Sequence, residues 1–168
     1  KNVKLILNSR NFGSIKSPYY AICQATGDAI IYLASDLQDP PELIYDFIEN
    51  WEKGCEVVIA RKYDSQKFKF LDVLRKFYYY ALDKLKDEGT KLVYNYQGFG
   101  LYDKKVIEKI KEVDDPYPYF RGAVLDLGYR MKIIDFDQPE RKNGVDKQNL
   151  FTLWDNGMLG LTRTTKVP

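Results

Sequence analysis

The chain has 168 residues, of which 45% are hydrophobic and 30% are charged, and this balance indicates one globular domain with a sizeable core rather than a disordered chain. The formal net charge of +2 gives no overall field that points to nucleic acid as a partner. The chain contains no histidine, which excludes Ser-His-Asp and Cys-His catalysis and every zinc site with a histidine ligand. Catalysis would therefore have to use carboxylates, Lys, Arg, Tyr, backbone groups and a hard cation.

Neither a disulfide framework nor a membrane anchor is visible in the sequence. Cys23 and Cys55 are the two cysteines, which are too few for such a framework and fit a reducing compartment. No apolar run approaches the roughly 20 residues of a membrane span, and no signal peptide is present. The chain starts without Met on residues 3–7, which already have the pattern of a strand, and stops abruptly at residues 166–168. We interpret both ends as cuts and expect residues 1–168 to be one domain from a longer protein.

Short apolar runs alternate with stretches of helical periodicity, which favours an α/β sheet with helical crossovers. Strands are expected at residues 3–7, 29–33 (a buried strand), 56–60 and 131–136. Helices are expected from the turn at 11–14 through Gln24, from Asp39 as N-cap to Gly54, and over residues 68–85, 104–113, about 122–127 and 148–159. The glycines of residues 98–101 predict a tight segment before Asp103.

The expected helix at 68–85 has an apolar face and a basic face. Its polar side carries six cations, namely Lys67, Lys69, Arg75, Lys76, Lys84 and Lys86. This pattern is typical of a solvated face around a core stripe. The alternative is a basic helix that lies against anionic lipid headgroups.

Oxygen-bearing side chains follow directly after the strand expected at 29–33. Asp36 and Gln38 alternate along what we take to be extended backbone, so both side chains would face one ion. In open α/β sheets, ligands bind beyond the carboxyl ends of the strands. Carboxylate and amide oxygens suit Mg²⁺ or Mn²⁺, which in turn bind diphosphate oxygens. The alternative is that the acidic residues only cap the start of a helix.

Two further clusters could bind anions. Residues 140–147 place three cations around a glycine turn, which fits either a phosphate clamp or a solvated basic loop. Arg121 follows an aromatic segment at 117–120 and either holds a phosphate or pairs with Asp126.

The segment 35–42, Ser-Asp-Leu-Gln-Asp-Pro-Pro-Glu, resembles the family 2 glycosyltransferases of the GT-A fold. The branch it is similar to contains dolichyl- and undecaprenyl-phosphate sugar transferases and their bacterial cell-envelope relatives. Further segments agree in the expected order, at residues 9–13, 25–29, 98–99, 118–122 and 140–144. The resemblance implies a Rossmann-like α/β fold with a mixed, mainly parallel sheet flanked by helices. It also implies that the N-terminal strands and the C-terminal membrane helices of the family lie outside this chain.

Carried over by position, the resemblance implies roles for single residues. Asp36 would be the second Asp of the Asp-x-Asp metal motif, Gln38 its metal-side neighbour, and Asp39 a substrate-binding residue beside them. Arg121 would line the active site, with Asp126 near the acceptor. The basic loop would hold the donor diphosphate or the acceptor phosphate through Arg141, Lys142, Gly144 and Lys147.

The sequence departs from the family pattern at two of these sites. Ala34 stands at the position of the first Asp of the metal motif, which removes one expected carboxylate. Asp146 stands where the family usually has Ser or Thr, which adds negative charge to a phosphate-binding loop.

The resemblance implies transfer of a sugar from a UDP- or GDP-sugar to a polyprenyl phosphate or a glycan, with Mg²⁺ or Mn²⁺ screening the diphosphate. The full-length protein would act at the cytoplasmic face of a membrane, and its oligomeric state stays open.

Two alternative functions remain. One is a catalytically inactive homologue that serves as a binding or assembly module, favoured by Ala34 and Asp146. The other is a nucleotidyltransferase that makes the sugar nucleotide.

Overall fold

The computed structural model describes residues 3–36, 38–63, 78, 80, 83–85, 92–113, 115, 118–139 and 150–164. Its strands are β1 (Ala29–Tyr32), β2 (Val57–Lys62), β3 (Tyr96–Asp103) and β4 (Met131–Phe136). Its helices are α1 (Gly13–Cys23), α2 (Leu43–Glu52), α4 (Lys104–Glu112), α5 (Phe120–Asp126) and α6 (Leu150–Thr164). Residues 78, 80 and 83–85 are also helical, and the rest of the helix expected at 68–85 lies outside the described residues.

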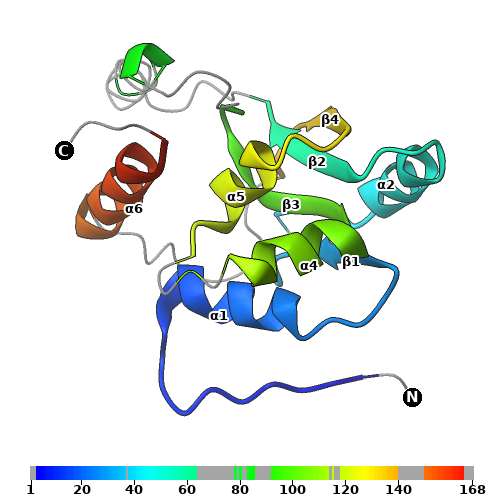
Figure 1. Cartoon of the computed structure of the whole chain (residues 1–168), viewed down its shortest axis with the longest axis horizontal. Helices are drawn as coiled ribbons and strands as arrows, with labels where there is room; N and C mark the ends of the chain where they lie inside the picture. Colours follow the sequence, from blue (N-terminus) through cyan, green and yellow to red (C-terminus); the bar gives the residue numbers. More distant parts are fainter. Residues whose placement is uncertain are drawn as a thin grey trace.

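The four described strands form one mixed sheet in the order β1-β3-β2-β4 (Figure 1). Strand β3 is antiparallel to both of its neighbours, and β4 is parallel to β2. Strands β1, β2 and β4 therefore run in one direction and β3 runs against them. The predicted mixed α/β sheet flanked by helices is confirmed.

Each face of the sheet is covered by helices because the central strand β2 is apolar on both sides. Val57 and Ile59 face one core, which α1, α4 and α5 complete. Val58 and Ala60 face the other core, where Phe47 of α2 packs against Phe99 at 5.0 Å between ring centroids. A strand buried on both faces is expected to read as a continuous apolar run, which is what residues 57–60 do.

The strand predicted at residues 3–7 is wrong. These residues have no regular secondary structure, and Val3, Leu5 and Leu7 are exposed. A strand is stable only when its backbone N–H and C=O groups pair with a neighbour. Within the described residues no segment pairs with this one, so its apolar alternation alone does not produce a strand.

Strand β3 was missed because two glycines interrupt its pattern. Residues 98–101 were predicted as a tight segment, yet they lie inside an eight-residue strand. A Cβ atom on Gly100 would come within 2.5 Å of the Val58 carbonyl oxygen, so the close approach of β3 and β2 requires glycine there. The glycine that reads as a turn signal is in this case a packing requirement.

One helix boundary and one burial prediction also differ from expectation. Helix α2 begins at Leu43 with Glu42 as its N-cap, so the prediction that Asp39 caps it is wrong. The prediction of a buried strand at 29–33 is only partly right, because Ile30 alone is buried and Leu33 is exposed. The reason is that β1 lies at the edge of the described sheet.

None of the described helices has the length and apolar character needed to cross a bilayer.

Candidate functional site at the end of strand β1

The chain turns sharply after β1, where polar side chains were expected. Residues 35 and 36 form a turn, and the Asp36 Oδ1 atom accepts a hydrogen bond from the Gln38 backbone N–H at 3.2 Å. This is the local pattern by which Asp side chains stabilise turns. The expected extended backbone, with Asp36 and Gln38 alternating, is therefore replaced by a turn that the Asp36 carboxylate stabilises.

Asp39 lies next to this turn and is almost buried, with 8% of its surface exposed. Its Oδ2 atom accepts a hydrogen bond from the Ala34 backbone N–H at 3.4 Å. Burial raises the pKa of the Asp39 carboxyl, and the nearby charge of Asp36 raises it further, whereas the Ala34 hydrogen bond lowers it. The turn thus brings two carboxylates close together beside the position where the expected first Asp of the motif is replaced by Ala34.

Arg121 reaches the same region from α5. Its Nη1 atom donates a hydrogen bond to the Tyr96 carbonyl oxygen at 3.4 Å, and its guanidinium lies 5.4 Å from the centre of the Tyr119 ring. Its Cγ atom is 4.0 Å from the point where Gly98 would carry a Cβ atom. Arg121 and Asp126 form no ion pair, although the structure describes both, so the alternative that Arg121 only neutralises Asp126 is wrong.

Tyr32 connects these groups, and sequence reasoning missed it. Its ring carbons lie 3.4 Å from the Gly98 Cβ position, on the same glycine that Arg121 approaches. Burial raises the pKa of the Tyr32 hydroxyl; Asp39 and Asp36 raise it further and Arg121 lowers it. The hydroxyl therefore stays protonated at neutral pH, close to two carboxylates and one guanidinium. A signal was present in the sequence, because Tyr32 lies at the end of an apolar run, four residues before Asp36.

Two buried tyrosines, Tyr96 and Tyr102, are hydrogen-bonded beneath this site. The hydroxyls of Tyr96 and Tyr102 are 2.6 Å apart, and the Tyr102 hydroxyl donates to the Gly98 carbonyl oxygen. Burial raises the pKa of both hydroxyls far enough to keep them neutral. The pair fixes the backbone of β3 at the glycine against which Tyr32 and Arg121 pack, so it sets the distance between those two side chains.

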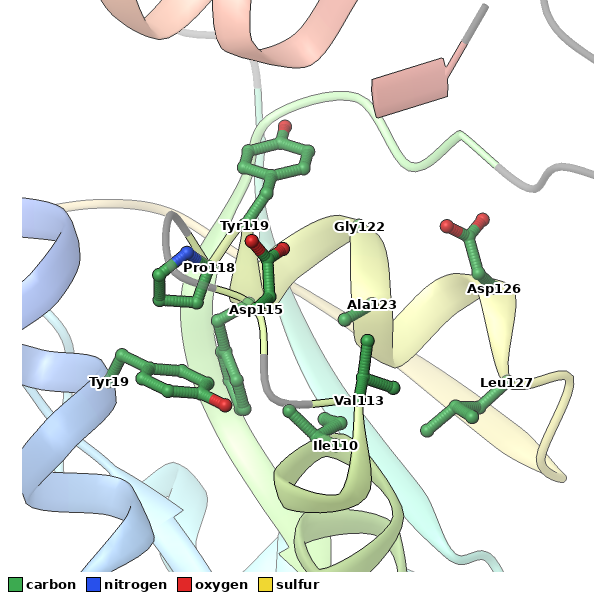
Figure 2. Close-up of a pocket in the computed structure, with 11 residues that line it drawn as sticks. Tyr19, Ile110, Val113, Asp115, Pro118, Tyr119, Gly122, Ala123, Asp126 and Leu127 are labelled. Carbon is green, nitrogen blue, oxygen red and sulfur yellow. The ribbon is translucent and has the colours of Figure 1, made fainter. Parts of the chain in front are cut away.

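Asp126 is placed elsewhere, in a cavity of about 170 Å³ between α1, α4 and α5 (Figure 2). Figure 2 shows Asp126 at the far end of α5 from Tyr119, with Leu127 beside it and Tyr19 reaching in from α1. Burial alone raises the pKa of its carboxyl. The structure therefore does not bring Asp126 together with Asp36 and Asp39, and Tyr119 is the side chain common to the cavity and the Arg121 contacts.

The basic loop lies outside the described residues. This applies to Arg141, Lys142, Gly144 and Lys147, and to Asp146. Their role in holding the donor diphosphate or the acceptor phosphate stays a prediction.

Asp36 and Asp39 are the described acidic residues near β1 that could hold a divalent cation. Within the part of the chain that is described, no group of three or more Cys, Asp or Glu side chains is arranged to hold a metal ion. Mg²⁺ is commonly bound by one or two carboxylates, with substrate phosphates and water completing its shell. The Asp36 and Asp39 carboxylates meet that lesser requirement.

Comparison with known proteins places this site in a family. Residues 1–111 match the family model of glycosyl transferase family 2. An uncharacterized glycosyltransferase of Synechocystis is 30% identical over all of this chain and 52% of its own length. One of Bacillus subtilis is 33% identical over 99% of this chain and 51% of its own length.

A bactoprenol glucosyl transferase of Shigella phage SfV is also similar, with 29% identity over 95% of this chain and 52% of its own length. The chain thus spans about half the length of the curated relatives it matches. The family model covers well over half of the chain, including the turn at Asp36 and the whole of β1, β2 and β3. The chain belongs to glycosyl transferase family 2.

Proposed function

We propose that this chain carries the donor site of an enzyme that transfers a sugar from a UDP- or GDP-sugar to a polyprenyl phosphate. The observation on which the proposal depends is the placement of Asp36, Asp39 and Arg121 near enough to Tyr32, the last residue of β1, for their charges to shift the pKa of its hydroxyl. A nucleotide diphosphate with a divalent cation needs carboxylates for the cation and donors for the phosphate oxygens. The site offers both kinds of group.

The carboxylates of Asp36 and Asp39 would hold Mg²⁺ or Mn²⁺, with the Gln38 side chain as a further candidate ligand. When bound, the cation would neutralise charge on the diphosphate leaving group. Asp39 is costly to ionise in isolation because it is nearly buried, and its pKa is raised. A cation that binds beside it favours the charged carboxylate, so cation binding and ionisation of Asp39 support each other.

Arg121 would contact a phosphate oxygen from the opposite side of the site. Its guanidinium already contacts the Tyr119 ring and the Tyr96 carbonyl oxygen, so few rotamers are lost when a ligand binds. The protonated Tyr32 hydroxyl can donate a hydrogen bond to the same anion. Together these side chains would orient the diphosphate so that the sugar carbon is open to attack.

The similarity to bactoprenol glucosyl transferases and the chemistry of the two acceptor types support a polyprenyl phosphate as the acceptor. A phosphate oxygen is already anionic at neutral pH, so a polyprenyl phosphate needs little help from a general base. With a glycan acceptor a hydroxyl would have to lose its proton, and Asp126 would be the candidate base. Asp126 lies in the cavity rather than beside Asp36, which favours the phosphate acceptor. A lipid acceptor would place the full-length enzyme at the cytoplasmic face of a membrane.

A second candidate function is a catalytically inactive family member that binds or assembles with other proteins. Ala34 favours it, because a methyl group stands where the motif has its first carboxylate. The position of Asp39 argues against the inactive family member. Its nearly buried carboxylate accepts a hydrogen bond from the Ala34 backbone N–H and so supplies a second acid close to Ala34.

The decisive test compares Asp36→Asn with Asp46→Asn in the full-length protein. Asp46 lies on α2, away from the turn, and serves as the matched acid-to-amide control. Sugar transfer from UDP- and GDP-sugars to undecaprenyl phosphate is measured, together with calorimetric binding of Mn²⁺ in the presence of the nucleotide. We expect Asp36→Asn to abolish both and Asp46→Asn to change neither. Unchanged transfer in Asp36→Asn would remove the cation site. Wild-type protein that shows neither transfer nor nucleotide-dependent Mn²⁺ binding would favour the inactive homologue.

A further inference from the structure

The Arg121 side chain is held by the protein on two sides and still keeps most of its hydrogen-bonding capacity. Its Nη1 atom donates to the Tyr96 carbonyl oxygen at 3.4 Å, and its guanidinium lies 5.4 Å from the centre of the Tyr119 ring. A guanidinium has five N–H donors. Within the described part of the chain, the Tyr96 carbonyl oxygen is the one hydrogen-bond acceptor that Arg121 meets. The remaining donors are therefore available to a ligand, and the two protein contacts restrict the direction in which they point.

The Tyr119 ring has a defined position because Gly122 has no side chain. Tyr119 is the N-cap residue of α5, and its carbonyl oxygen accepts a hydrogen bond from the Ala123 backbone N–H at 3.0 Å. Its ring lies over the first turn of the helix, so a Cβ atom on Gly122 would be 2.5 Å from Tyr119 Cδ1 and 2.8 Å from Cε1. Glycine is unfavourable inside a helix. The packing of the Tyr119 ring gives a physical reason for a glycine at position 122.

The other end of the Tyr119 ring reaches α6. Its hydroxyl oxygen lies 3.7 Å from the point where Gly160 would carry a Cβ atom, and Figure 2 shows this oxygen on the side of the ring that faces the ribbon of α6. The Tyr78 hydroxyl is 2.8 Å from the same point. The Tyr119 ring is thus in contact with α5 along one edge and close to α6 at its hydroxyl end, which restricts the rotamers open to it.

The positive charge of Arg121 acts at the end of β1. Burial raises the pKa of the Tyr32 hydroxyl, the charges of Asp39 and Asp36 raise it further, and the charge of Arg121 lowers it. Tyr32 is the last residue of β1. The guanidinium and the two carboxylates are therefore all near enough to one hydroxyl to act on it, and the orientation of Arg121 decides whether its donors are available there.

We propose that Tyr119 is a positioning residue, whose ring holds the Arg121 guanidinium near Tyr32 so that its remaining N–H donors meet a phosphate oxygen of the ligand. The proposal rests on the proposed function, because it takes Arg121 as a group that binds the diphosphate. A side chain that is held before the ligand arrives loses less conformational entropy on binding. Orientation is important for arginine in particular, because its planar guanidinium binds phosphate through two parallel hydrogen bonds.

The first test measures the affinity of the full-length protein for pyrophosphate with Mn²⁺ by calorimetry. Tyr119→Leu removes the aromatic face, and we expect it to weaken binding about fivefold, the usual effect of losing one cation–π contact. Tyr119→Phe keeps the ring and should stay within about twofold of the wild type. Tyr45→Leu is the matched control, because Tyr45 is 81% exposed on α2. Wild-type affinity in Tyr119→Leu, or an equal loss in Tyr119→Phe, would overturn the proposal.

A double-mutant cycle separates positioning of Arg121 from a general effect on the fold. Arg121→Gln should weaken binding about tenfold to a hundredfold, since it removes hydrogen bonds to a charged ligand. We expect Tyr119→Leu combined with Arg121→Gln to bind as Arg121→Gln alone does, because a residue that acts through Arg121 then has no guanidinium to orient. A further loss of about fivefold in the double variant would show that Tyr119 acts without Arg121 and would overturn the proposal.

Gly122→Ala tests the same contact and leaves both side chains in place. The added methyl group has to displace the Tyr119 ring, whereas alanine itself favours the helix. We expect binding to weaken about fivefold, as in Tyr119→Leu, with no further loss when Arg121→Gln is also present. Gly157→Ala on α6 is the matched control, because its Cβ atom would lie 3.9 Å from the nearest atom of Tyr78. Wild-type affinity in Gly122→Ala would contradict a role for the position of the ring.

Turnover gives a readout that a merely structural role would not change. In the full-length enzyme, Tyr119→Leu should raise the KM for the nucleotide sugar about fivefold and leave kcat within about twofold, because Arg121 would contact the diphosphate both before and during transfer. A lower kcat at unchanged KM is the result expected from loss of folded enzyme, and it would overturn the proposal.

The Arg121 variant separates this proposal from the proposed function. If Arg121→Gln binds pyrophosphate with Mn²⁺ as tightly as the wild type, the proposed function loses its phosphate-binding arginine. If Arg121→Gln binds weakly while Tyr119→Leu and Gly122→Ala bind as the wild type does, the role of Tyr119 alone is contradicted.

Discussion

The backbone N–H of Ala34 donates a hydrogen bond to the Asp39 carboxylate, at 3.4 Å from nitrogen to Oδ2. This contact places a carboxylate beside Ala34, the residue at which the resemblance to the family predicts the first Asp of the metal motif. Asp39 is nearly buried and lies close to Asp36. Burial and the negative charge of Asp36 both make ionisation of Asp39 less favourable. The site in its ligand-free form therefore carries an electrostatic penalty that a bound cation would remove.

Asp39→Asn should stabilise the ligand-free fold at neutral pH and weaken binding of Mn²⁺ with nucleotide. The pKa of Asp39 is raised above its ordinary value of 3.8, so its charge opposes folding. That cost is absent below pH 3.8 and appears as the pH rises through the raised pKa. The gain in the free energy of unfolding, measured by urea denaturation, should be present at pH 7 and vanish near pH 3. A variant that is less stable than the wild type at pH 7 would show that the Ala34 hydrogen bond outweighs burial.

Tyr32→Phe should weaken the binding of pyrophosphate with Mn²⁺ by about tenfold to a hundredfold, which is the usual effect of losing one hydrogen bond to a charged ligand. The free energy of unfolding should change little, since the ring that packs on Gly98 is kept. Calorimetric titration gives the affinity. Tyr45→Phe on the exposed side of α2 is the control, and equal affinities for the wild type and Tyr32→Phe would remove Tyr32 from the site.

Three of the four described strands could be predicted from short apolar runs, because Ala29–Tyr32, Val57–Lys62 and Met131–Phe136 owe their form to local sequence. The two wrong strand predictions, at residues 3–7 and at β3, depend on pairing between segments that are far apart in the sequence. Residues 3–7 have the pattern of a strand but no described partner, and β3 has a partner but a pattern broken by Gly98 and Gly100. Pairing is a property of two segments, so one segment alone does not reveal it.

The candidate site was predictable at Asp36 and much less so elsewhere. A polar turn after an apolar strand is visible in sequence, and so is an arginine after an aromatic run. The meeting of Tyr32 with Arg121 depends on Gly98, which belongs to the strand that was missed. Asp126 was expected near the acceptor, and whether it acts there stays a prediction, although its place in the cavity is now known.

Trp51→Phe should lower the free energy of unfolding by about 1–2 kcal/mol, because it removes the hydrogen bond from the indole N–H to Asp103 Oδ2 at 2.8 Å. The same Asp103 also caps α4 by accepting from the Lys105 backbone N–H, so its position matters to two elements. Urea denaturation measures the loss. Trp154→Phe, an identical change at an exposed site, should stay within about 0.5 kcal/mol of the wild type. Equal losses in the two variants would contradict a specific role for the Asp103 contact.

Gly100→Ala should lower the free energy of unfolding by about 2–3 kcal/mol, because the added methyl group meets atoms that do not move easily. The Cβ atom would lie 2.5 Å from the Val58 carbonyl oxygen and 3.0 Å from the Ile59 Cα atom, both in the backbone of β2. To make room, β3 and β2 would have to separate at the centre of the sheet, next to the backbone that carries Gly98. We therefore expect the variant to lose affinity for pyrophosphate with Mn²⁺ as well as stability.

The matched control is Gly157→Ala on α6, where the new Cβ atom would lie 3.9 Å from the Tyr78 ring, an ordinary contact. Alanine is favoured over glycine inside a helix by about 1 kcal/mol, so this variant should be as stable as the wild type or more so. Thermal unfolding followed by circular dichroism distinguishes the two. If Gly100→Ala melts with the wild type, β3 and β2 do not approach as closely as the structure has them, and the positions of Tyr32 and Arg121 across Gly98 lose their support.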